Sequence, residues 1–102
     1  MFPVREFEAR FQEILDALDA LGADLAGEDA GTLEDLNAEL EDALFMLSEI
    51  DPKGADAADE LWDTFETLEA LAGDIRKVGA AAPLAERLAM LASLARENVG
   101  NG

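Results

Sequence analysis

Carboxylates are the side chains whose number and spacing could give this sequence a chemistry. The chain holds 24 Asp and Glu residues against seven Lys and Arg, and it contains no His, Tyr or Cys. Without His there is no serine triad and no Glu-x-x-His di-iron site. Without Cys there is no disulfide, no thiolate nucleophile and no cysteine metal site. The chemistry that remains is the binding of a hard cation such as Mg²⁺ by oxygen ligands.

Two carboxylate pairs share one spacing. Glu13 and Asp16 form an E-x-x-D pattern, and Glu39 and Asp42 repeat it. Residues three apart share one face of a helix. The stretch ELEDALFML, residues 39–47, is similar to the metal-binding helix of MazG-like nucleotide pyrophosphohydrolases. The resemblance, which covers about residues 13–47, implies a small all-helical protein that hydrolyses nucleoside triphosphates. It also implies that these four carboxylates hold the Mg²⁺.

The same carboxylates have a simpler interpretation as solvated helix faces. In so acidic a chain, acid pairs three residues apart occur about as often as chance predicts. Ile14 and Leu40 belong to the apolar pattern, which points the neighbouring acids towards water. The second helical segment also lacks the Lys or Arg that a triphosphate would need. We therefore expect no catalytic residue and no cofactor, and the hydrolase remains the alternative hypothesis.

The formal net charge of −17 restricts the partners. It opposes direct binding to nucleic acid and to anionic membranes, because both need clustered Lys and Arg. A basic protein would be attracted. The leading hypothesis for function is a non-catalytic interaction module with a carboxylate-rich surface and an apolar patch, acting as an adaptor, an inhibitor or an immunity-type partner of a basic protein. Solubility, or a salt-rich habitat, would explain the same charge.

Apolar residues at alternating spacings of three and four predict the elements that carry these acids. We expect one domain, residues 1–102, with helices at about 3–26, 32–50, 56–79 and 83–98. Gly27, the run 51–54 (DPKG), Gly79 and Pro83 mark the breaks. Connections this short favour antiparallel neighbours. The predicted fold class is all-α, an up-and-down antiparallel four-helix bundle.

The last helical segment, residues 80–95, is nearly uncharged and is expected to organise the core. Its apolar surface, with that of residues 43–47, is broader than a bundle core requires. This predicts a second interface and a homo-oligomer, most simply a dimer. The alternative is that alanine sits comfortably on a surface. A purely structural homo-oligomer is a third hypothesis for function. The predicted interface residues are Phe45, Met46, Leu84, Leu88, Met90, Leu91 and Leu94.

Neither a signal peptide nor a membrane span is expected. Residues 1–11 contain no apolar stretch of the kind that a secretory signal needs. The longest wholly apolar runs, 43–47 and 88–92, are far shorter than a membrane-spanning helix. These observations predict a cytoplasmic protein.

Overall fold

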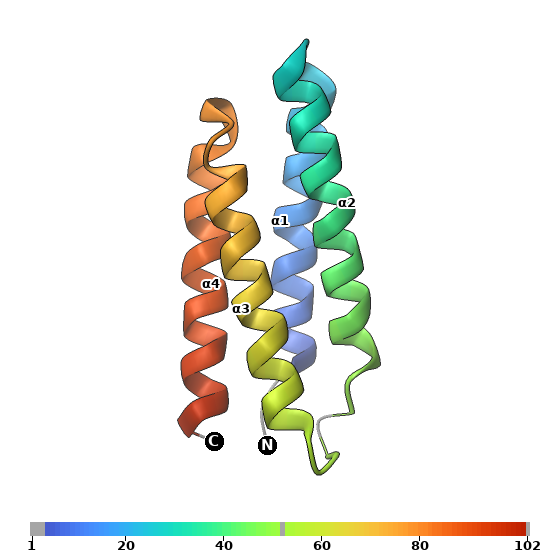
Figure 1. Ribbon diagram of the computed structural model, residues 1–102, viewed down its shortest axis with the longest axis vertical. Helices are drawn as coiled ribbons and strands as arrows, with labels where there is room; N and C mark the ends of the chain where they lie inside the picture. Colours follow the sequence, from blue (N-terminus) through green and yellow to red (C-terminus); the bar gives the residue numbers. More distant parts are fainter. Residues whose placement is uncertain (1–3, 52, 102) are drawn as a thin grey trace.

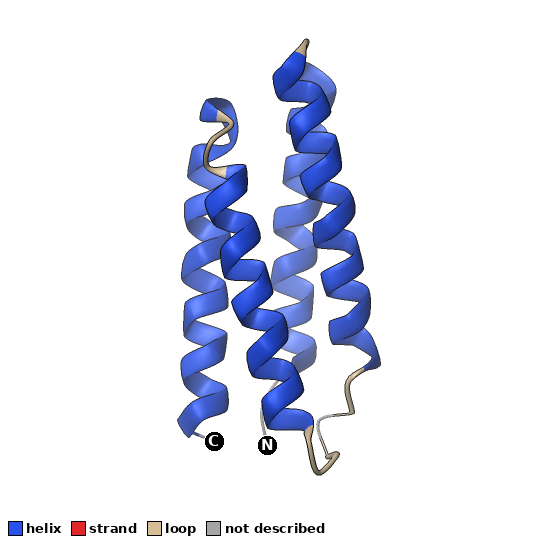
Figure 2. Ribbon diagram, viewed as in Figure 1, coloured by secondary structure: helices blue, strands red, loops and turns tan. Residues whose placement is uncertain are grey.

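The computed structural model describes residues 4–51 and 53–101, with side chains to residue 99. Its elements are α1 (Val4–Asp24), α2 (Glu28–Glu49), α3 (Ala57–Ile75), a short 3₁₀ turn η1 (Gly79–Ala81) and α4 (Ala82–Asn101). Successive helices run in opposite directions (Figure 1). Each helix packs on its neighbour in sequence, and α1 packs on α4, which closes the ring. The described part of the chain is helical apart from its connections (Figure 2). The predicted up-and-down four-helix bundle is confirmed.

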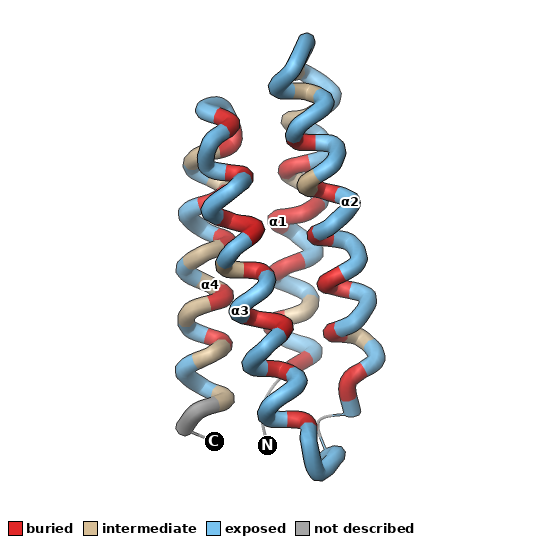
Figure 3. The backbone as a smooth tube through the Cα atoms, viewed as in Figure 1, coloured by how far each residue is buried: buried red, intermediate tan, exposed pale blue. Residues whose placement is uncertain are grey.

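The core runs along the axis of this ring, where one face of every helix is buried (Figure 3). Its centre is aromatic and joins two helices that lie diagonally across the bundle. The Phe65 ring of α3 lies 5.8 Å from that of Phe11 and 6.4 Å from that of Phe7, both on α1. Such ring pairs add about 0.5–1.5 kcal/mol beyond the apolar area they bury. The regularly spaced apolar residues of α1 therefore face the core, as their spacing predicts.

On α4 the buried side differs from the predicted one. The spacing of Leu84, Leu88, Leu91 and Ala95 predicts that these residues face the core, but Leu84 and Leu91 are only half-buried. The buried positions of α4 are mostly alanines, whose short side chains let a neighbouring helix approach closely. In agreement with this, α3 and α4 make the most extensive helix–helix contact in the bundle. Small core-facing residues leave the larger ones on the outer side of α4. The buried set is Ala85, Leu88, Ala92 and Ala95, with Ala81 from η1.

The connection between α1 and α2 is tighter than predicted. Gly27 has a φ of 71°, the left-handed conformation that glycine adopts without strain. It allows α2 to begin at Glu28, four residues before the predicted start at Thr32, so Thr32 does not cap the helix. Glu28 and Asp29 lie in the first turn, where negative charge favours the helix dipole. Pro3, the predicted first residue of α1, lies outside the described residues.

The other helix ends also shift by a few residues. The third helix ends at Ile75 instead of residue 79, because Val78 turns inwards and is buried with 1% of its surface exposed. Asp56 occupies the N-cap position of α3 as predicted, but its side chain makes no capping hydrogen bond. The last helix begins one residue before Pro83 and continues to Asn101. Among the described residues, no helix combines the length and apolar character of a membrane crossing.

Candidate functional site

The four carboxylates that would hold Mg²⁺ under the alternative hydrolase hypothesis lie on neighbouring helices but do not form a metal-binding cluster. Glu13 and Asp16 are exposed on α1, and Glu39 and Asp42 are exposed on α2. Asp16 accepts a hydrogen bond from Gln12 Nε2 at 3.1 Å. In the part of the chain that the structure describes, no group of three or more acidic side chains could hold a metal ion. The geometry therefore gives no support to the hydrolase hypothesis.

Charge is unevenly distributed around the ring of helices. Within its bounds α2 has eight acidic residues and α3 has six, and neither contains a Lys or Arg. On α4 two acids balance two bases, Arg87 and Arg96, and the bases of α1 are Arg5 and Arg10. α2 and α3 are neighbours in the ring and are its most negatively charged pair of adjacent helices, and a surface of the bundle lies along the line where they meet. We call this the α2/α3 face.

A groove of about 440 Å³ runs between α2 and α3 on this face. Ala43 and Ile50 are buried at its floor, and the side chain of Met46 is 61% exposed. Three carboxylates from the two helices surround these apolar groups. They are Glu49, Glu60 and Asp63. The arrangement is an apolar strip with an anionic rim, which is complementary to an amphipathic segment that carries Lys or Arg.

The other polar groups of this groove are already satisfied within α3. The hydroxyl of Thr64 donates to the backbone carbonyl of Glu60 at 2.8 Å. The hydroxyl of Thr67 donates in the same way to Asp63 at 3.0 Å. The polar groups that the groove offers to a ligand are thus its carboxylates, which attract cations.

Glu39 and Asp42, two of the carboxylates named for the alternative hydrolase hypothesis, continue the line of acidic residues along α2 beyond the groove. Glu39 is seven residues before Met46, and Asp42 is seven before Glu49, so each shares a face with its groove residue two turns away. The sequence thus identified these two carboxylates as candidates, and the structure places them on the same helix face as two residues of the groove.

The predicted interface residues fall into two separate groups. Phe45 and Met46 lie on α2, whereas Met90 and Leu94 lie on α4, and all four are at least 48% exposed. The ring places α2 diagonally across from α4, so the two groups cannot form one continuous surface. Leu88 is not available to any partner, because it is completely buried in the core. The half-buried Leu84 and Leu91 lie between these extremes.

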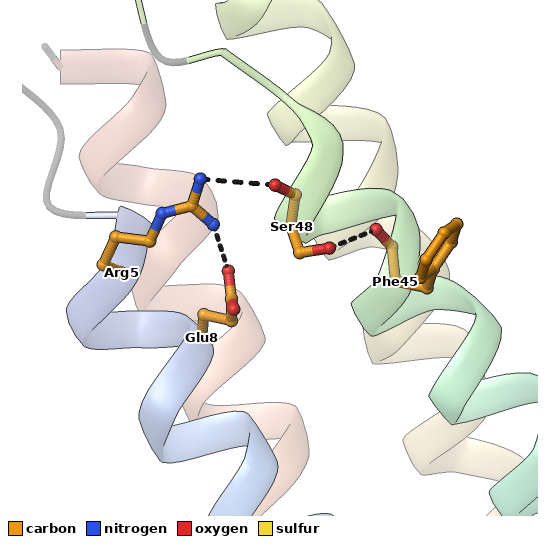
Figure 4. A network of polar contacts seen from close by, with 4 residues as sticks. All are labelled: Arg5, Glu8, Phe45 and Ser48. Atoms are coloured by element: carbon orange, nitrogen blue, oxygen red, sulfur yellow. Dashed lines mark hydrogen bonds and ion pairs between the residues drawn. The ribbon is translucent and has the colours of Figure 1, made fainter.

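The α1/α2 side of the bundle is engaged in internal polar contacts (Figure 4). Arg5 of α1 pairs with Glu8 at 2.6 Å and donates to the backbone carbonyl of Ser48 at 3.2 Å. The second bond satisfies one of the carbonyls that a helix leaves free in its last turn. The ring of Phe45 extends away from this network (Figure 4).

Asn37 is a buried polar residue that the sequence analysis missed. It is 6% exposed on α2, and its Nδ2 donates to Asp19 Oδ1 at 3.2 Å. Its Oδ1 is buried and has no hydrogen-bond partner. Its burial could have been predicted from its position, four residues after Leu33 and three before Leu40, which are both fully buried. This spacing places an amide among the core-facing apolar positions of α2.

Comparisons with known proteins found no match for this chain. No protein-family model, no curated protein and no solved structure matches the chain.

Proposed function

We propose that this protein is a non-catalytic interaction module that binds a basic protein partner through its α2/α3 face. The observation that carries the proposal is the α2/α3 groove, where exposed Met46 lies among Glu49, Glu60 and Asp63. Neither of the two helices contains a Lys or Arg that could neutralise these carboxylates. The partner segment is an amphipathic helix with Lys or Arg beside its apolar strip.

Each part of the face has its own role in this proposal. The carboxylates of α2 and α3 attract a basic partner over distance and raise its association rate, most strongly at low salt. Met46 then provides a flexible apolar contact that adapts to the shape of the incoming side chains. The carboxylates at the groove rim set the orientation by pairing with the partner's cations. An adaptor, an inhibitor and an immunity-type protein would all use this mechanism.

Self-association belongs to the same proposal. The exposed Met90 and Leu94 on α4 are on the opposite corner of the ring from α2. A second copy bound there would leave the α2/α3 face open, and the dimer would present two basic-partner sites. We place the protein in the cytoplasm, where such a partner would meet it.

A capture experiment from the native cell tests the proposed function. The tagged protein is incubated with lysate at low salt, and the bound proteins are eluted with increasing NaCl. We expect a specific basic protein that elutes with salt and is lost when Glu49 and Asp63 are both replaced by Lys. A partner that the double variant retains, or one that resists high salt, would contradict the proposal.

A further inference from the structure

The outer surface of α4 differs from the rest of the molecule because it is electrically balanced. A groove of about 660 Å³ between α1 and α4 is lined by two bases and two acids, in a chain of net charge −17. The apolar part of its lining is Ile14, Met90, Leu91 and Leu94. Two copies of so acidic a protein repel each other over most of their surfaces. At this groove, where acids and bases are equal in number, the local repulsion is small.

Four exposed residues on α4 form a stripe that is complementary to itself. They are Arg87, Met90, Leu94 and Glu97, at spacings of three, four and three, and all line the groove. When a second α4 is laid antiparallel about a twofold axis at residue 92, each member meets a suitable counterpart. Arg87 faces Glu97 of the other copy, and Met90 faces Leu94. Because a twofold interface repeats every contact, each pairing occurs twice.

In the part of the chain that the structure describes, the charges of this stripe form no ion pair. Among the described residues, neither Arg87 nor Glu97 takes part in a salt bridge, although five others join bases to acids. The two are ten residues apart on one helix, about 15 Å along its axis, which is too far for an ion pair. A second copy would bring these two side chains together.

We propose that the protein forms a twofold dimer through antiparallel packing of α4, held by Met90 against Leu94 and by Arg87 against Glu97 of the second copy. The inference rests on the proposed self-association and names the surface that forms it. It is independent of the α2/α3 groove, which lies on the other side of the ring.

Charge reversal at the stripe tests the pairing by sedimentation velocity. Arg87→Glu and Glu97→Arg should each weaken dimerisation about tenfold, because two attractive pairs become two repulsive ones. The mixture of these two variants should form mixed dimers, since every facing pair is then of opposite sign. The double variant should recover wild-type dimerisation. Met90→Glu, at a side chain 73% exposed, should give a folded monomer.

Matched controls separate this pairing from the effect of total charge. Lys53→Glu makes the chain more acidic by the same amount as Arg87→Glu, and Glu39→Arg makes it less acidic by the same amount as Glu97→Arg. We expect Glu39→Arg to leave dimerisation equal or stronger, while Glu97→Arg weakens it. A wild-type monomer at high micromolar concentration would overturn self-association altogether. A dimer that the reversals do not weaken, or whose single variants do not pair when mixed, would overturn this α4 surface alone.

Discussion

The guanidinium carbon of Arg96 on α4 lies 5.2 Å from the centre of the Trp62 ring on α3. The same guanidinium forms an ion pair with Glu69 on α3, with 2.8 Å between Nη1 and Oε2. These contacts join α3 to α4 and cover part of a tryptophan that is 40% exposed. They also occupy Arg96 on the α3/α4 side, so this base does not reduce the negative charge of the α2/α3 face.

We predict that Arg96→Ala lowers the free energy of unfolding by about 1–2 kcal/mol, because it removes a cation–π contact and an ion pair whose side chains are only 29% and 33% exposed. Urea denaturation followed by circular dichroism measures the effect. Arg76→Ala is the matched control, since Arg76 pairs with Glu86 of α4 at 3.3 Å but both side chains are more than 60% exposed. The control should change stability by less than about 0.5 kcal/mol. Equal effects of the two substitutions would show that Trp62 contributes nothing.

Asn37 provides a second stability prediction. Its buried Oδ1 lacks a partner, and an unsatisfied buried polar atom costs about 1–3 kcal/mol. Asn37→Leu should therefore raise the free energy of unfolding by about 1–3 kcal/mol in urea denaturation. Asp19→Ala should instead lower it by about 1 kcal/mol, because Asn37 Nδ2 loses its acceptor. A leucine variant less stable than the wild type would show that the hydrogen bond from Asn37 Nδ2 stabilises the fold by more than the unpaired Oδ1 destabilises it.

The bundle could be predicted from sequence because its helices repeat apolar residues with one period and its loops are short. The helix ends and the buried side of α4 depend on contacts that the spacing of apolar residues does not specify. Gly27 moves the start of α2 because it adopts a positive φ, which sequence spacing does not reveal. On α4 several positions are apolar on more than one side, so the period alone did not separate buried Ala85 from half-buried Leu84.

The candidate site was less predictable than the fold. Carboxylates at a regular spacing suggested a metal site only as an alternative to solvated helix faces. The sequence does not give the separation between exposed side chains on two helices, because that separation depends on how the helices pack in the ring. Phe45 and Met90 were assigned to one interface because both were apolar beyond the needs of a core. Only the closed order of helices shows that α2 and α4 lie diagonally opposite each other.

We predict that stability rises with salt. With 24 acids and seven bases, carboxylates repel one another across the compact bundle, and added ions shorten this repulsion to about 8 Å at physiological ionic strength. The melting temperature at pH 8 should therefore increase from low NaCl to several hundred millimolar. The measurement is a thermal melt followed by circular dichroism. A melting temperature that is unchanged or falls with salt would show that ion pairs formed by the acids outweigh the repulsion among them.

We predict no nucleotide hydrolysis that depends on Glu39. The side chain is exposed on α2, and the described residues form no metal-binding group around it. Purified protein should release no measurable phosphate or pyrophosphate from nucleoside triphosphates with Mg²⁺ or Mn²⁺, and Glu39→Gln should be indistinguishable from the wild type. Robust turnover that this substitution abolishes would reverse the order of the two functional hypotheses.

Binding of a basic amphipathic peptide tests the α2/α3 face most directly. The probe is a fluorescent helical peptide with Leu along one face and Lys on both sides of it, titrated with protein in a NaCl series. The double variant Glu49→Lys and Asp63→Lys should weaken binding at least about tenfold at low salt and flatten the salt dependence. Glu34→Lys with Glu41→Lys is the matched control, because it changes the total charge equally, outside the groove. We predict that the control loses much less affinity than the groove variant; equal losses would show that net charge alone attracts the peptide and would contradict a docking site between α2 and α3.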